Sequence, residues 1–217
     1  FVDIHIHGFG GSMAFDSQED LLTVASSLVK YGTTSFLPTI DGMRSLPTLL
    51  EKLAQIRETM GTEKDASQIL GIHMEGPFLS TQEPAVGVQR LDSLREPSLV
   101  EFHKMYEAAG GALRYMTIAP ELDGAFEVIK ELNKFCIVPS AGHSMASYDE
   151  VARAIGLGLR SVCHTFNGMA PLHHRSVGLV GAALTRTELN AELIGDGQHV
   201  GKPWSFYLSV RELVELP

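Results

Sequence analysis

The sequence lacks any long apolar run. Although 44% of its 217 residues are hydrophobic, no stretch approaches the roughly 18 consecutive apolar residues of a membrane-spanning helix. The first five residues, FVDIH, carry neither the basic segment nor the long apolar core of a signal peptide. We therefore expect no membrane association and a cytoplasmic location.

Basic residues are also scarce. Lys and Arg number 17 against 26 Asp and Glu, which gives a formal net charge of −9 at pH 7. Nucleic-acid binding needs clustered Lys and Arg, and the sequence has no such cluster, so we expect no nucleic-acid partner. An anionic small molecule stays compatible, because one nearby arginine outweighs the overall field at close range.

Cysteine is limited to Cys136 and Cys163. Both lie in apolar stretches that are typical of buried strands. We therefore predict two reduced thiols in the core of a cytoplasmic protein rather than a disulfide.

The sequence does contain an alternation of short β-rich runs and longer segments with helical periodicity. This alternation predicts a parallel sheet covered by helices. We expect seven strands, at residues 2–7, 33–37, 69–74, 113–118, 135–138, 160–163 and 193–194. We expect helices at residues 16–30, 46–60, 98–109, 124–133, 148–155 and 203–216, and a long functional loop at residues 79–97.

The fold class that fits this pattern is α/β, a TIM-type (β/α)8 barrel. No GxGxxG follows the first predicted strand and no Walker loop occurs, which disfavours a nucleotide-binding doubly wound sheet. A complete barrel takes eight units and about 250 residues. We therefore expect residues 1–217 to form one incomplete barrel domain of about seven units, with strand eight outside it.

Polar side chains gather where the predicted strands end, which is where barrel active sites are built. His5 and His7 end the first strand and share one face of it, so both rings can reach one point. Two such nitrogens suit a divalent cation, although a chance pair remains an alternative. Glu75 ends the third strand inside an apolar run, where a carboxylate needs a compensating cation. His73, two positions earlier, is expected to be a hydrogen-bonded interior residue rather than a ligand.

Two further histidines complete this set. His143 follows the fifth predicted strand and His164 ends the sixth. Each alone is more often a hydrogen-bonded core residue, but with the three preceding candidates they put five ligand side chains at one end of the barrel. His and Glu ligands with an open position fit a catalytic metal that activates bound water.

Six segments then carry a family resemblance: residues 3–8, 73–78, 119–121, 141–144, 164–169 and 196–200. In this order they resemble the N-acetylglucosamine-6-phosphate deacetylases of the amidohydrolase superfamily. Residues 171–175 and 178–183 strengthen the match, which spans nearly the whole chain. The resemblance implies removal of the N-acetyl group of N-acetyl-D-glucosamine 6-phosphate, which gives D-glucosamine 6-phosphate and acetate.

The resemblance also implies roles for single residues. Glu75, His143 and His164 would hold the principal metal, zinc or iron, and His5 and His7 a second one. Asn167 and Gly168 would contact the sugar phosphate, and Arg175 would bind its phosphate across a homodimer interface. His199 would serve catalysis and substrate binding. Without the family, a solvent-exposed Arg175 and a turn-forming Asn167 are equally good interpretations.

The chain departs from the family pattern in two places. Residues 83–89 contain no histidine where the family has a phosphate-binding one. The family's catalytic aspartate ends strand eight, which we expect outside the sequence together with the flanking β-sandwich domain. Two other functions therefore stay open: an amidohydrolase acting on a different amide, and a non-catalytic fragment or degenerate homologue.

Overall fold

Parallel strands form the main sheet of the computed structural model, which describes residues 1–43 and 45–202. The strand order is β1-β4-β6-β7-β8-β9-β10, and the short β5 also pairs with β4. The strands are β1 (Val2–Ile6), β4 (Ser35–Asp41), β5 (Gln68–Ile69), β6 (Ile72–Glu75), β7 (Leu113–Ile118), β8 (Val138–Ala141), β9 (Ser161–Val162) and β10 (Asn190–Ala191). A separate antiparallel pair is formed by β2 (Gly8–Phe9) and β3 (Ser12–Met13).

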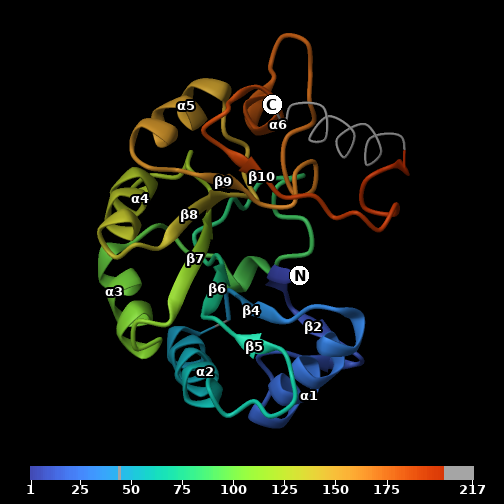
Figure 1. Ribbon diagram of the computed structural model, residues 1–217. Coiled ribbons are helices and arrows are strands. Elements are labelled where there is room, and N and C mark those ends of the chain that lie inside the picture. Colours follow the sequence, from blue (N-terminus) through green and yellow to red (C-terminus); the bar gives the residue numbers. More distant parts are fainter. Residues whose placement is uncertain (44, 203–217) are drawn as a thin grey trace.

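Helices follow the strands and cover the outer side of the curled sheet (Figure 1). They are α1 (Gln18–Leu28), α2 (Leu46–Thr59), α3 (Leu99–Ala108), α4 (Ala125–Lys134), α5 (Tyr148–Gly156) and α6 (Gly178–Thr185), with 3-10 turns η1 (Val29–Tyr31) and η2 (Leu91–Ser93). In the described part of the chain, no helix has both the length and the apolar composition to cross a bilayer. The arrangement confirms the predicted α/β barrel-type fold class: in the described residues, seven parallel strands follow one another in a curled sheet.

Local sequence explains where the helices begin. Ser17, Ser45, Ser98 and Ser147 are N-caps whose hydroxyl groups accept hydrogen bonds from backbone N–H groups of the first turn. At α5, Glu150 completes a capping box by accepting from the backbone of the cap residue. Each of these four helices then buries one apolar face against the sheet, which fixes the strand ends at the opposite side of the core.

Of the predicted strands, only 113–118 is observed with the same bounds, and the strand expected at 69–74 is divided into β5 (Gln68–Ile69) and β6 (Ile72–Glu75). Three of the differences have a local cause. Residue 38 does not stop β4, although proline lacks the N–H group that a strand interior needs. The register between β1 and β4 shifts there, and Ile6 N donates to the side chain of Thr39. Strand β8 starts at Val138 and not at 135, because Phe135 caps α4 and Cys136 has a left-handed φ of 55°. Strand β10 lies at 190–191 and not at 193–194, since its pairing follows β9.

Two more expectations need correction or lie outside the description. Cys136 is exposed in the turn after α4, so the prediction of two core thiols holds only for the buried Cys163; both are free. Helix α6 was not predicted, because Gly178 and Gly181 weaken its pattern. The helix expected at 203–216 lies outside the described residues. The loop expected at 79–97 is present and contains only η2.

Candidate metal centre

Glu75 lies at the centre of the histidine cluster, at the end of β6. Its Oε1 atom lies 2.9 Å from His164 Nε2 and 3.2 Å from His143 Nε2. These two Nε2 atoms are 3.2 Å apart. All three side chains are buried. Three residues from β6 and from the ends of β8 and β9 therefore converge on one point.

The backbone turns sharply to aim the two histidine rings. His143 and His164 have left-handed φ angles of 46° and 29°, which non-glycine residues seldom adopt and which occur at functional sites. Gly168 packs directly on the ring of His143: a Cβ atom there would lie 2.8 Å from His143 Nδ1. The ring positions are thus fixed by the chain around them.

The Nδ1 atoms of the two rings face backbone carbonyl groups. His143 Nδ1 lies 2.7 Å from Ala85 O, and His164 Nδ1 lies 3.1 Å from Asn167 O. A carbonyl oxygen only accepts, so each Nδ1 carries the proton. In the neutral ring, Nε2 is then unprotonated and presents its lone pair to Glu75. Lone pairs that face a carboxylate repel one another unless a cation lies between them.

His5 and His7 join the cluster from β1. His7 Nε2 lies 3.3 Å from Glu75 Oε2, and His5 Nε2 lies 3.6 Å from Oε1. The two Nε2 atoms are 3.3 Å apart. The structure therefore brings together all five side chains that the sequence singled out as metal ligands. Their spacings are close to the ~3.3 Å between ligands that lie about 2.0–2.1 Å from a tetrahedral zinc.

The charges of the cluster depend on one another. Burial disfavours the Glu75 carboxylate, but hydrogen bonds from His143, His164 and His7 outweigh burial and hold its pKa well below the usual value. Burial also disfavours protonated His143 and His7, yet the hydrogen bond to Glu75 raises the pKa of each ring. A divalent cation would therefore compete with protons for the ring nitrogens of His143 and His7.

Side chains in three overlapping groups bring their ligand atoms within 4.8 Å of one another. These groups are His5-His7-Glu75, Glu75-Cys163-His164 and His5-His73-Cys163. His73 behaves as expected from the sequence, because its Nδ1 donates to Ile4 O at 2.9 Å and its Nε2 accepts from Thr117 Oγ1 at 2.9 Å. Complete burial is the main cause that lowers the pKa of His73 to about 3.

Sequence reasoning missed three polar neighbours of the cluster. Glu192 accepts from His5 Nδ1 at 3.2 Å and from the hydroxyl group of Tyr115. Gln89 donates to Glu75 Oε2 at 2.9 Å. Glu192 follows a short strand, so the argument applied to Glu75 would have found it. Gln89 lies in the long loop, where no periodicity pointed to it.

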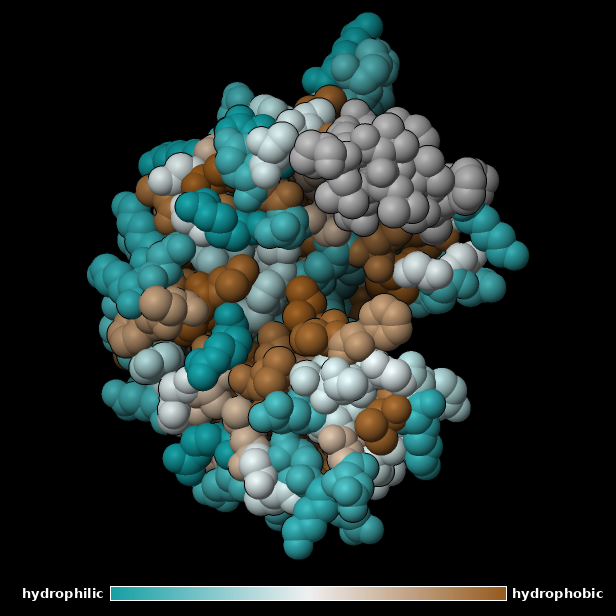
Figure 2. All heavy atoms as spheres, viewed as in Figure 1, coloured by the Kyte–Doolittle hydropathy of each residue, from teal (hydrophilic) through white to brown (hydrophobic). Residues whose placement is uncertain are grey.

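A cavity of about 860 Å³ opens over the cluster. Apolar side chains gather around the hollow in the middle of the face shown in Figure 2. Among the cavity's lining residues are Val2, Ile4, Val88, Leu193 and Ile194. The polar side chains of the cluster therefore lie at the base of the cavity and apolar side chains line its sides, as in many small-molecule sites.

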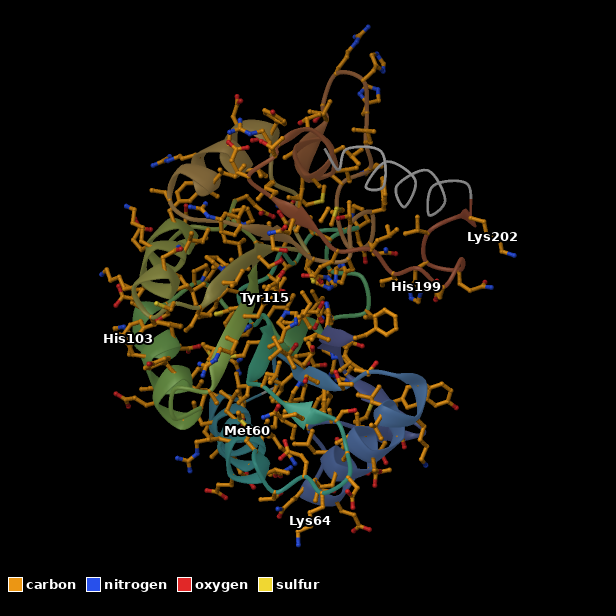
Figure 3. The ribbon with its side chains drawn as sticks, in the orientation of Figure 1. Met60, Lys64, His103, Tyr115, His199 and Lys202 are labelled. Carbon is orange, nitrogen blue, oxygen red and sulfur yellow. The ribbon has the colours of Figure 1, made fainter. Side chains whose placement is uncertain are left out.

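Of the residues expected to contact substrate, Asn167, Gly168 and His199 line this cavity. His199 lies on the loop after β10, at the open side of the molecule (Figure 3), and its Nδ1 is 2.7 Å from Asp196 Oδ2. Hydrogen bonds from the backbone N–H groups of His199 and Gln198 lower the pKa of Asp196 to about 2. Arg175 lies outside the cavity, in the exposed stretch 171–176.

The sequence of this chain is similar to those of known proteins. The model of the amidohydrolase family matches residues 1–189. N-acetylglucosamine-6-phosphate deacetylase of Bacillus subtilis (strain 168) is 36% identical over 202 residues, which cover 91% of this chain and 50% of that protein. N-acetylgalactosamine-6-phosphate deacetylase of Escherichia coli O157:H7 is 32% identical over 92% of this chain and 52% of that protein.

The chain is also similar to solved structures of deacetylases. N-acetyl-D-glucosamine-6-phosphate deacetylase of Mycobacterium smegmatis, as a D267A mutant in complex with N-acetyl-D-glucosamine-6-phosphate, superposes with a TM-score of 0.88 at 31% identity. The superposition covers 97% of this chain and 54% of that chain. The chain thus spans about half the length of the relatives it matches.

Proposed function

The chain belongs to the amidohydrolase family, and on this premise we propose that it forms the barrel part of a metal-dependent deacetylase. The substrate would be N-acetyl-D-glucosamine 6-phosphate, and the products D-glucosamine 6-phosphate and acetate. The observation that carries the proposal is the convergence of the Nε2 atoms of His143 and His164 on the Glu75 carboxylate beneath a cavity. Relatives that cover most of this chain are named for this reaction.

The residues present fit a divalent metal, zinc or iron. Glu75, His143 and His164 would hold the principal ion, and His5 and His7 would add a second. The fit rests on the donor set itself: one carboxylate and four imidazole Nε2 atoms converge at spacings that suit the ligands of a divalent cation. Such an ion, when bound, polarises an amide carbonyl and lowers the pKa of water.

The remaining residues would bind and orient the sugar phosphate. Asn167 and the backbone of Gly168 line the cavity beside His143 and would hold the sugar. His199, held by Asp196, would orient the acetamide from the rim. Arg175 is exposed and is not among the residues that line the cavity of its own chain, so we propose that it binds phosphate in the site of a second copy, in a cytoplasmic homodimer.

Hydrolysis requires that the attacking water gives up a proton and that the leaving nitrogen takes one up. Water adds its oxygen to the acetyl carbon, the C–N bond breaks, and the leaving nitrogen takes up a proton to become the free amine of the sugar. The family resemblance assigns this transfer to an aspartate at the end of strand eight. The apolar walls of the cavity would keep bulk water from the reacting amide.

Metal analysis and an acetate-release assay on the complete protein test the proposal. Glu75→Ala should lose bound metal and lower acetate release by more than about 100-fold, since even outer partners of metal ligands cost about 10- to 100-fold. Glu188→Ala is the matched control, because Glu188 is an exposed carboxylate paired with Arg186. Full activity of Glu75→Ala in the absence of metal would refute the proposal.

A second candidate substrate is the galactose epimer, because a relative that is 32% identical is named for it. Comparing kcat/KM for N-acetylglucosamine 6-phosphate, N-acetylgalactosamine 6-phosphate and unphosphorylated acetylhexosamines distinguishes these candidate substrates. Preference for an unphosphorylated amide would favour a different amidohydrolase activity. Metal binding without any turnover would favour a non-catalytic homologue.

A further inference from the structure

Glu192 joins two elements that lie at opposite edges of the sheet. Strands β1 and β10 are the outermost strands, and within the described residues no ladder pairs them. Glu192, directly after β10, nevertheless lies with its Oε2 atom 3.2 Å from Nδ1 of His5 on β1. Its other oxygen, Oε1, accepts from the hydroxyl group of Tyr115 on β7. Tyr115 lies in the middle of the curled sheet, whereas His103 lies on the outer helix layer (Figure 3).

The backbone holds Glu192 in this place. Its N–H group donates to Val162 O at 2.9 Å, and its carbonyl group accepts from Thr165 N at 2.8 Å. The side chain is 14% exposed. A half-buried strand end with two backbone hydrogen bonds gives the carboxylate little freedom, so its oxygens stay aimed at His5 and Tyr115.

We propose that Glu192 is the positioning residue of the second metal site. A carboxylate only accepts, so the short contact fixes the proton of His5 on Nδ1 and leaves Nε2 unprotonated. That Nε2 faces His7 and Glu75. Hydrogen bonding of the outer nitrogen to a carboxylate orients metal-bound histidines and raises their basicity. This inference rests on the proposed metal centre.

The other neighbours of His5 do not supply the same effect. His73 uses both ring nitrogens on Ile4 O and Thr117 Oγ1, so it has no free atom for His5. Cys163 Sγ also lies 3.3 Å from His5 Nδ1, but a buried thiol is a weak partner for a ring nitrogen. Glu192 is the one carboxylate at this nitrogen among the hydrogen bonds and ion pairs of the described residues.

The experiment measures two independent properties of Glu192→Ala and Glu192→Gln in the complete protein. The first is metal stoichiometry and affinity, obtained by titrating zinc against a chelator. We expect Glu192→Ala to weaken the second ion about 10- to 100-fold and to leave the first ion unchanged. Glu192→Gln keeps an accepting oxygen and should lose less. Glu188→Ala is the control, since it removes an exposed carboxylate close to β10.

The second property is the tautomer of His5 in the metal-free protein, read from the ¹⁵N shifts of its ring and assigned with His5→Asn. We expect the Nδ1–H form in wild type and in Glu192→Gln, and a shift toward the Nε2–H form in Glu192→Ala. Unchanged tautomer and unchanged second-ion affinity in Glu192→Ala would overturn the inference. A wild-type protein that binds no zinc would overturn the proposed function instead, while the tautomer measurement still tests Glu192. Circular dichroism verifies folding. If Glu192→Ala unfolds, Glu192→Leu takes its place, because leucine is similar in size and also removes both accepting oxygens.

Discussion

The Nε2 atoms of His143 and His164 lie 3.2 Å apart, and both face the same oxygen of Glu75. Their Nδ1 atoms are hydrogen-bonded to backbone carbonyl groups. Two neutral rings held in this way direct lone pairs at each other and at an anion. A cation bound between them would relieve this repulsion.

Metal binding should therefore stabilise the fold. At a free zinc concentration of 100 times Kd, the free energy of unfolding should rise by about 2.7 kcal/mol, or roughly 5–10 °C in Tm for a domain of this size. Thermal scans with and without chelator measure the shift. Glu75→Gln should abolish it and Glu188→Gln should not. An equal shift in both variants would place the stabilising ion elsewhere.

Gly168 should not tolerate a side chain. Its φ is 59°, and a Cβ atom would lie 2.8 Å from His143 Nδ1. We expect Gly168→Ala to cost about 1–3 kcal/mol of stability and to weaken metal binding by displacing the ring. Denaturant unfolding and zinc titration measure the two effects.

Gly156→Ala is the matched control for that variant. Gly156 ends α5, and no atom lies within 4 Å of its added Cβ. Alanine there should leave metal binding unchanged and stabilise the helix by up to about 1 kcal/mol. Similar losses in both variants would mean that the contact with His143 is not the cause.

His73 should make the protein sensitive to acid. Its folded pKa is about 3, against 6.5 for the free side chain. Between these values the unfolded state binds one more proton, so stability is complete above about pH 6.5 and falls toward pH 3. The slope should be about 1.4 kcal/mol per pH unit. In this pH window, the slope of the free energy of unfolding against pH should be smaller in His73→Gln than in wild type by the value for one proton. Equal slopes would show that another group titrates.

The two thiols should react at different rates. Cys136 is exposed, whereas burial raises the pKa of the Cys163 thiol far above its usual value. A thiol reagent at pH 8 should modify one cysteine rapidly and the second only after unfolding. Cys136→Ser should remove the fast phase. Two fast phases in the native protein would contradict the buried position of Cys163.

The sequence predicted the parts of the fold that depend on periodicity and strand ends. Glu75, His143 and His164 follow short apolar runs, and parallel strands bring such ends together wherever the sheet curls. It failed where a backbone turn decides the outcome. The left-handed Cys136 ends a helix inside an apolar stretch, and β4 continues through the proline at 38, where its register with β1 shifts and Ile6 N donates to Thr39 Oγ1.

Contacts across the barrel could not be predicted in the same way. Glu192 meets His5 over 187 residues of sequence, and Gln89 reaches Glu75 from a loop without periodicity. Such pairs depend on the curvature of the sheet and on loop conformation, which no local pattern encodes. The five predicted ligands needed only their own strand ends, so they could be found residue by residue.

Arg175 offers the sharpest test of the proposed dimer. It is exposed and is not among the residues that line its own cavity, so the proposed dimer places it in the site of the second copy. Arg175→Ala should lower kcat/KM for the sugar phosphate roughly 10- to 100-fold, the value of a charge-assisted hydrogen-bond pair. Alone, Arg175→Ala should therefore retain about 1–10% of wild-type activity and Glu75→Ala less than about 1%. When they are unfolded and refolded together, half of the dimers are mixed, and each mixed dimer has one site with both residues intact. Activity should then return to about a quarter of wild type. No recovery in dimers shown to be mixed would place the phosphate contact of Arg175 within its own chain or exclude it.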